Sequence, residues 1–145
     1  MPMRLEIVTA ERILFEGEVD VVVAPGGDGE LGVLPHHAAV MTTLAPGELR
    51  YRVGGEDNHY VVHGGFMDIR GVQVVVLADA AELVNEIDEA RAEEAIARAE
   101  ERIATRGEDV DLERALASLR RAQVRLRITR RHRRQRPTGA GSVPQ

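Results

Sequence analysis

Cysteine, lysine and tryptophan are missing from this 145-residue sequence, and aromatic residues make up only 3% of it. The absence of cysteine excludes disulfide bonds and thiolate metal sites. A core must therefore be built from aliphatic residues, and a hydrophobic content of 43% is enough for one. No run approaches the roughly 20 apolar residues of a membrane span, and Met1–Glu6 lacks the apolar stretch of a signal peptide. We expect a small cytosolic or peripheral protein.

Acidic residues are absent from the C-terminal end, although the whole chain has a net charge of −5. Up to Glu113 there are 9 arginines against 24 acidic residues, whereas from Arg114 onward there are 10 arginines and no acid. A basic end on an acidic body favours an acidic partner, either a protein or a nucleic acid. The alternative is a solvated tail that has no partner.

Residues 5–80 carry the signals of β structure. Apolar or alternating stretches are separated by turn signals such as Pro46-Gly47 and Gly64-Gly65, and Pro25–Gly29 is expected to be a loop. The pattern predicts strands at Leu5–Val8, Glu18–Ala24, Ala39–Leu44, Glu48–Val53, His59–Val62, Phe66–Ile69 and Val72–Ala78. Such spacing, with no helical interval, predicts an antiparallel β-sandwich of about ten short strands over residues 1–84.

Near Asp79 the composition changes to alanine, glutamate and arginine at helical spacing. Asn85 is placed to cap a first helix, and Gly107 to end it. Asp109 or Asp111 is placed to cap a second helix. We predict an antiparallel two-helix hairpin over residues 85–130, followed by a disordered arginine-rich tail over residues 131–145. The stripes are rich in alanine and bury little apolar area, so the hairpin should be only marginally stable.

Four charged residues of the hairpin could form a binding site. Asp88 and Arg91 are three positions apart, and Arg121 and Arg125 are four apart, so each pair shares one helical face. The planar, forked donors of arginine suit phosphate oxygens. A hairpin that brings the four together could hold a nucleotide. The competing interpretation is a salt-bridged surface.

Other motifs give no support for catalysis or metal binding. Gly27–Gly32 fits G-x-G-x-x-G, but it runs into further β pattern instead of opening a helix. The pairs His36-His37 and His59 with His63 have no partner at a recognised zinc spacing. No nucleophile accompanies the carboxylates near the first helix. We therefore predict a protein without catalytic activity of its own and without a metal or required cofactor.

Several motifs, in order, are similar to those of one known family. They are Gly29–Ala38, Leu44–Gly47, Gly64–Phe66, Val75–Asp79 and Ile87–Ala92. Over roughly residues 3–130 the sequence resembles the epsilon subunit of bacterial F-type ATP synthase, the small subunit at the foot of the central rotor stalk.

The resemblance implies partners for both parts of the chain. In that family the β-sandwich binds the gamma subunit and the membrane-embedded c-ring, and by position Glu30 and His37 are candidates for this rotor interface. The helical hairpin either lies folded on the sandwich or extends along gamma toward the catalytic beta and alpha subunits, where it blocks ATP hydrolysis. Such a subunit couples proton flow to ATP synthesis. We therefore expect a peripheral protein on the cytoplasmic face of the cell membrane.

The resemblance also implies ATP as a regulatory ligand. Some members bind ATP through an Ile-Asp-x-x-Arg-Ala motif and two arginines of the second helix. The residues that match here, together with an acidic residue before the motif, are Glu82, Ile87, Asp88, Arg91, Ala92, Arg121 and Arg125. The arginines would neutralise phosphate charge, the carboxylates would accept hydrogen bonds from adenine or ribose, and Ile87 and Ala92 would offer apolar contact.

The basic end of the chain extends past the point where many members of the family stop. In the family, basic residues of the last helix face an acidic segment of beta, so the candidates for an inhibitory contact are Arg130, Arg131, Arg133 and Arg134. An alternative function is a free-standing nucleotide-sensing module with an arginine-rich tail that binds nucleic acid or protein. From Arg114 onward there is no aromatic residue for base stacking, so we expect no nucleic-acid partner.

Overall fold

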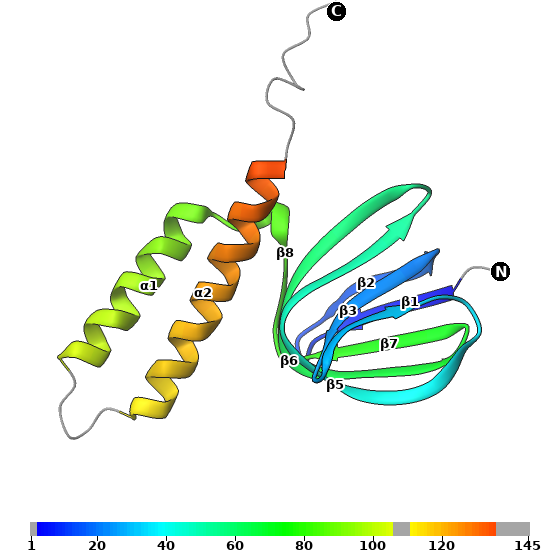
Figure 1. Ribbon diagram of the computed structural model, residues 1–145, viewed down its shortest axis with the longest axis horizontal. Coiled ribbons are helices and arrows are strands. Elements are labelled where there is room, and N and C mark those ends of the chain that lie inside the picture. Colours follow the sequence, from blue (N-terminus) through cyan, green and yellow to red (C-terminus); the bar gives the residue numbers. More distant parts are fainter. Residues whose placement is uncertain (1–2, 106–110, 136–145) are drawn as a thin grey trace, which may run out of the picture. The chain divides into compact units, whose positions relative to one another are not determined.

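The chain forms two compact units, Met1–Leu83 and Val84–Gln145. The computed structural model describes residues 3–105 and 111–135. Strands make up the first unit and helices the second (Figure 1).

The first unit is a β-sandwich, as the sequence predicts. Its eight strands are β1 (Met3–Val8), β2 (Ile13–Val19), β3 (Val21–Gly26), β4 (Gly29–Val33), β5 (His37–Val53), β6 (Glu56–Gly71), β7 (Gln73–Ala78) and β8 (Ala81–Leu83). Hydrogen bonds join them in the order β2-β1-β7-β6-β5-β3-β4, and β8 pairs with β6. All of these pairs are antiparallel except β1 with β7, which are parallel.

The sheet has eight strands, not about ten: two predicted turns lie inside long strands, whereas β4, β8 and most of β2 lie outside the seven predicted ranges. Pro46-Gly47 and Gly64-Gly65 bend β5 and β6, which have 17 and 16 residues, without ending them. Gly64 and Gly65 have φ angles of 92° and 118°, a region that residues with a Cβ rarely adopt. A Cβ at Gly65 would also lie 2.1 Å from the carbonyl oxygen of Leu77. These glycines let the strands curve, so one hydrogen-bonded sheet folds over into layers (Figure 1).

Alternating side chains of the strands fill the core of the sandwich. In β1, Met3, Leu5 and Ile7 are fully buried, whereas Arg4 and Glu6 point outward. Three of the four aromatic residues gather at one place: the Tyr51 ring centroid lies 4.3 Å from that of Phe15 and 6.1 Å from that of Tyr60. Burial raises the pKa of the Tyr51 hydroxyl above its usual range.

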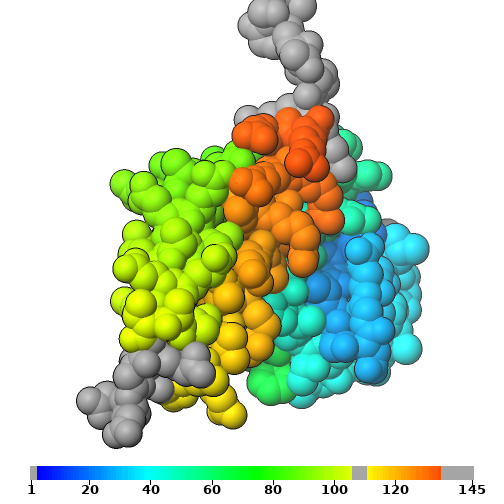
Figure 2. Space-filling model, turned by 60° about the vertical axis from the view of Figure 1, so that its left-hand side comes forward, coloured from blue at the N-terminus to red at the C-terminus, as the bar shows by residue number. Residues whose placement is uncertain are grey.

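The second unit is the predicted helical hairpin. A 3-10 turn, η1 (Val84–Glu86), leads into α1 (Glu89–Ala104), and α2 (Leu112–Gln135) returns beside α1 (Figure 1 and Figure 2). Small buried residues on both helices, Ala92, Ala99 and Ala122, are 0–8% exposed, which agrees with the alanine-rich stripes. Close approach of the two helices follows from these small side chains.

The helix boundaries differ from the prediction at two places. Asp88, not Asn85, caps α1, because residues 84–86 form the 3-10 turn. At the other end, α2 continues five residues beyond Arg130 to Gln135, so the start of the predicted tail is helical. Asp111 caps α2, since its carboxylate accepts a hydrogen bond of 3.2 Å from the backbone N–H of Arg114. Gly107, Asp109 and residues 136–145 lie outside the described residues.

Candidate functional site

Asp88 fixes the start of α1. Its Oδ1 atom accepts hydrogen bonds from the backbone N–H groups of Ala90 (2.9 Å) and Arg91 (3.3 Å). Its other oxygen lies 3.9 Å from the Arg91 Nε atom, and both side chains are exposed. Asp88 therefore satisfies two N–H groups that the helix itself cannot pair. The structure brings together these two members of the predicted site.

Two apolar residues of the predicted site, Ile87 and Ala92, are buried in different surroundings. Ala92 is fully buried in the hairpin, and Ile87 is 9% exposed. Ile87 lines a small cavity of about 160 Å³ that Thr129 and Arg133 also border. A predicted apolar contact of Ala92 with a ligand would require this packing to loosen.

Arg121 and Arg125 lie on α2, whereas Arg91 lies on α1. The Arg121 Nη2 atom donates to the Ser118 hydroxyl at 3.1 Å. Ion pairs put Arg130 beside the first turns of α1, where Arg91 is found. Arg121 is nine residues before Arg130, which corresponds to about 13 Å along a helix with a rise of 1.5 Å per residue. In the folded hairpin, the Arg91 and Arg121 backbones are therefore offset along the direction of the helix axes.

Four ionic side chains join the two helices at the end remote from their connection. Arg130 Nε lies 3.0 Å from Glu89 Oε1, and Arg130 Nη2 lies 2.5 Å from Glu93 Oε1. Arg133 Nη1 lies 2.9 Å from Glu89 Oε2. The hydrogen bonds to Glu89 and then Glu93 raise the pKa of Arg130. We call these four residues the hairpin ion cluster. It includes two of the arginines predicted to contact beta.

A groove on the hairpin lies next to this cluster. It encloses about 650 Å³ and is lined by Ile96 of α1 and, on α2, by Gln123, Leu126, Arg127, Arg130, Arg131 and Arg134. Four of the seven lining residues are arginines, and two are aliphatic. We call it the arginine groove. The sequence analysis missed it as a pocket, although the arginine spacing of α2 was a visible signal.

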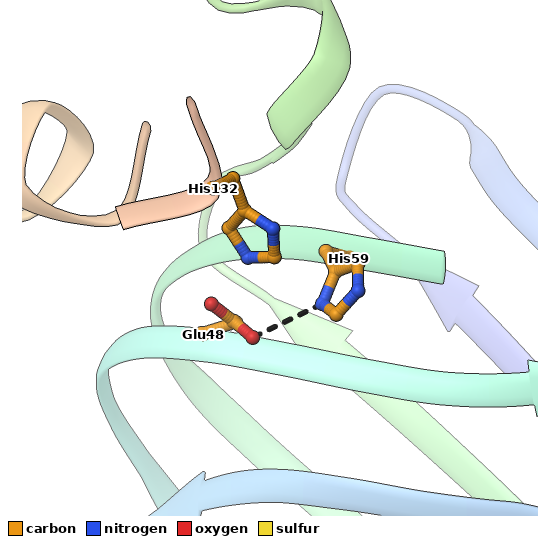
Figure 3. A group of neighbouring side chains, drawn as sticks. All are labelled: Glu48, His59 and His132. Carbon is orange, nitrogen blue, oxygen red and sulfur yellow. Dashed lines mark hydrogen bonds and ion pairs between the residues drawn. The ribbon is translucent and has the colours of Figure 1, made fainter. Parts of the chain in front are cut away.

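Glu82 belongs to the first unit, where it lies on β8. Its Oε2 atom is 3.7 Å from His63 Nε2, and the His63 side chain is only 6% exposed. Another carboxylate and histidine of the sandwich also pair: His59 Nδ1 lies 3.1 Å from Glu48 Oε1 (Figure 3). The structure therefore assigns Glu82 a neighbour within the sandwich.

Glu30 and His37, the candidates for the rotor interface, lie on different strands. Glu30 is on β4, and its carboxylate lies 3.6 Å from Arg50 Nη2. His37 opens β5, and its Nδ1 atom is 2.7 Å from the carbonyl oxygen of Ala38. Leu34, in the loop between these strands, is 62% exposed.

Three exposed apolar side chains lie in a row of paired residues that crosses five strands of the sandwich. The register pairs Thr43 with Phe66, Phe66 with Leu77, Leu77 with Val8, and Val8 with Ile13. Residues opposite each other on paired strands point to the same face. Phe66, Leu77 and Ile13 are 51–60% exposed. We call these five residues the apolar row. The sequence analysis missed it, because it depends on the strand pairing.

Two protein-family models match consecutive parts of the chain. The β-sandwich domain of the ATP synthase delta/epsilon chain matches residues 2–84, and the long α-helix domain of the same chain matches residues 85–130. The chain belongs to the ATP synthase delta/epsilon chain family. The predicted epsilon-type family and its sandwich-plus-hairpin fold are thereby confirmed.

Similar proteins of this family carry the name ATP synthase epsilon chain. The relative from Herpetosiphon aurantiacus is 46% identical over 130 residues, which cover 90% of this chain and 96% of the relative. A relative from Dehalococcoides mccartyi is 52% identical over 132 residues, covering 90% and 94%. A relative from Chloroflexus aggregans is 49% identical over 132 residues, covering 91% and 95%.

Solved structures of ATP synthases contain chains with a similar fold. A chain in the mitochondrial ATP synthase of Euglena gracilis, solved with its c-ring, has a TM-score of 0.68 at 23% identity and matches over 92% of this chain and 80% of that one. A chain in the central stalk and c-ring of the Tetrahymena thermophila enzyme has a TM-score of 0.56 at 14% identity, covering 91% and 96%. In the described residues, neither helix is long and apolar enough to cross a membrane.

Proposed function

We propose that this epsilon-type chain is a non-catalytic rotor subunit of a proton-translocating ATP synthase. It joins gamma and the c-ring through its sandwich, so that proton-driven rotation reaches the catalytic subunits. The apolar row carries this proposal, because its three large exposed apolar side chains, Ile13, Phe66 and Leu77, are aligned on one face, as is typical of a surface that another protein covers. A subunit held this way is peripheral, at the cytoplasmic face of the membrane.

Co-purification with gamma tests the proposal. We would co-express the full chain with tagged gamma and replace two members of the row, Phe66→Asp with Leu77→Asp. Both side chains are about half exposed, so the sandwich should fold with the charges in solvent. The matched control is Val53→Asp, which is 40% exposed and lies outside the row. Loss of gamma in the double variant alone supports the proposal, and retention of gamma in all variants would overturn it.

For the c-ring side we propose the surface around Glu30, Leu34 and His37. Glu30 and Leu34 have side chains that are more than 60% exposed. A Glu30→Arg variant places two positive groups, its own and that of Arg50, where one ion pair now lies. We expect it to bind gamma normally and to lower proton-coupled ATP synthesis in reassembled membranes.

We further propose that the hairpin restrains ATP hydrolysis and that ATP favours its folded form. Two features support movement: the helices pack through alanines, and the hairpin ion cluster is partly exposed, so opening costs little. Opening would release Arg130 and Arg133 from Glu89, and these arginines could then face an acidic segment of beta. A ligand that binds only the folded hairpin would shift this equilibrium.

Two measurements test this regulation. Deleting residues 130–145 should raise the ATPase activity of the assembled enzyme, and unchanged activity across a salt series would exclude the inhibitory contact. Calorimetric titration of the isolated subunit with ATP, beside an Arg121→Ala, Arg125→Ala variant, tests the sequence-predicted site. We expect no metal or other cofactor to be required.

A further inference from the structure

Asp28 and Gly29 form an aspartate–glycine pair where β3 turns into β4. In the whole chain no other aspartate or asparagine is followed by glycine. An aspartate before glycine cyclises readily, because the glycine nitrogen can reach the aspartate carboxyl carbon with no Cβ in the way. The product is a five-membered imide ring, which water then opens. The pair is therefore a candidate site of covalent change, and its surroundings decide whether the change occurs.

The turn leaves this pair accessible. Gly27 and Asp28 are the two turn residues, and both, like Gly29, are exposed. A Cβ built on Gly29 would have no heavy atom within 4 Å apart from its chain neighbours, so there is room around the attacking residue. Within residues 3–105 and 111–135 the Asp28 carboxylate has no hydrogen-bond or ion-pair partner. Nothing in that part of the chain holds the carboxylate away from the Gly29 nitrogen.

Two other exposed aspartates of the sandwich unit serve as internal references. Asp20 precedes Val21, and Asp79 precedes Ala80. A Cβ on the following residue crowds the backbone nitrogen, and the branched Cβ of valine crowds it more than that of alanine. Asp28 differs from both references in the residue that follows, so a comparison within one molecule isolates the effect of glycine.

One side of the turn is anchored, and the other side can open. The Gly27 backbone N–H donates to the carbonyl oxygen of Thr43 at 3.1 Å, which ties the first turn residue to β5. Gly26 and Gly29 form the last pair of the β3–β4 ladder. The end pair of a ladder opens at low free energy, since no further pair has to break. Opening of this pair lets the Gly29 nitrogen approach the Asp28 carboxyl group.

We propose that Asp28 isomerises to isoaspartate through a succinimide formed with Gly29. The Gly29 nitrogen attacks Cγ of the neutral Asp28 carboxyl, a C–N bond forms, and the hydroxyl leaves as water with the amide proton. Water then adds to the ring. When it breaks the bond between the nitrogen and the original main-chain carbonyl carbon, the chain runs through Cγ and that carbon becomes a free carboxylate. No oxidant or cofactor takes part, and the product has the composition of the starting protein.

Isomerisation alters the strand that carries Glu30. It inserts one methylene group into the backbone of a two-residue turn, and turn length fixes the register of a hairpin. The next pair of the ladder is Pro25 with Glu30, and the Glu30 carboxylate lies 3.6 Å from Arg50 Nη2. Glu30 belongs to the surface proposed for the c-ring. The modified turn should therefore weaken that contact, a consequence that rests on the proposed function, whereas the isomerisation itself does not.

Ageing of the full-length subunit in water enriched in heavy oxygen tests the isomerisation. Hydrolysis of the imide places one oxygen atom from water on residue 28, and mass spectrometry with electron-transfer fragmentation distinguishes isoaspartate from aspartate. We expect label to accumulate at Asp28 on the order of tenfold faster than at Asp20 or Asp79, since glycine has no Cβ to hinder the attack. Equal labelling at the three positions, or no isoaspartate at residue 28, would overturn the proposal.

Two substitutions at Asp28 give matched controls. Asp28→Glu keeps an exposed negative charge, but its carboxyl group would have to form a six-membered ring, so it should remain unlabelled. Asp28→Asn forms the same imide with loss of ammonia and should acquire label faster than the wild type. If the glutamate variant were labelled as fast as the wild type, the oxygen would exchange without an imide and the proposal would be wrong.

A second measurement tests the consequence for the rotor contact. Fresh and aged wild type are assembled with the other subunits, beside aged Asp28→Glu. We expect only the aged wild type to lose proton-coupled ATP synthesis, with gamma still bound. If isoaspartate forms and synthesis is unchanged, the consequence for the c-ring contact is overturned and the modification site stands. Failure of the rotor proposal appears instead as a subunit that does not co-purify with gamma, whether fresh or aged.

Discussion

Asp88 has a structural role and a predicted ligand role, and substitution can separate them. It caps α1 through two hydrogen bonds to backbone N–H groups, and the sequence predicts that the same carboxylate binds ATP. Replacing an aspartate cap by alanine costs about 1 kcal/mol. Loss of its charge at the positive end of the helix adds about 0.3 kcal/mol, the low end of the usual range, because the side chain is 56% exposed. Asp88→Ala should therefore destabilise the hairpin by about 1–1.5 kcal/mol.

The matched variant is Asp88→Ser, because serine caps helices about as well as aspartate. Thermal unfolding followed at 222 nm reports the helices. A domain of this size loses about 4–8 °C per kcal/mol, so Asp88→Ala should lower the helical melting temperature by roughly 5–10 °C. Asp88→Ser should lower it by less than about 3 °C. Equal losses in both variants would show that the cap does not hold α1.

The same pair of variants tests the ligand role of Asp88. If its carboxylate accepts a hydrogen bond from the nucleotide, Asp88→Ser should bind ATP about tenfold more weakly while the helix remains intact. If Asp88 is a cap alone, the serine variant should bind ATP as the wild type does. Calorimetry on the full-length subunit measures this difference.

Three other predictions concern the sandwich and the hairpin. Gly65→Ala should destabilise the sandwich by about 3 kcal/mol or more in urea unfolding, since its Cβ would meet a carbonyl oxygen of β7. The control is Gly54→Ala, where φ is 57° and the space around the residue is open, and this variant should lose only about 1 kcal/mol of stability. The hydrogen bonds from Arg52 lower the pKa of Asp57, so their stabilisation is complete above the unfolded-state pKa of about 3.9 and is lost as the pH falls through the lower folded value. The stability difference between wild type and Asp57→Asn should thus be constant above about pH 5 and shrink below pH 4, and a pH-independent difference would contradict this origin. Salt should lower the melting temperature of the wild-type hairpin more than that of a Glu89→Gln, Glu93→Gln variant, which lacks the hairpin ion cluster. If the melting temperatures of both proteins change equally with salt concentration, the cluster contributes nothing to stability.

Local patterns of the sequence were enough to predict the types of secondary structure and to recognise the family. Alternation and turn residues predict a sandwich, and apolar spacing at three and four predicts the two helices. The sequence offers Asp109 or Asp111 as the cap of the second helix, and the hydrogen bond from Arg114 identifies Asp111 as a cap. The sequence does not determine the start of α1, because Asn85 and Asp88 are both residues that cap helices well. The structure has a 3-10 turn at Val84–Glu86, so α1 begins after Asp88.

Tertiary structure decided which residues act together. The apolar row needs the register of five strands, which depends on burial over the whole sandwich. The hairpin ion cluster joins residues 37 to 44 positions apart, a pairing that no local spacing encodes. Gly64-Gly65 has the composition of a turn, but the partners on both sides of β6 keep the strand continuous. Local preferences determine whether each segment forms a strand or a helix. Long-range packing determines which strands pair and which helix faces contact each other, and the candidate sites depend on these contacts.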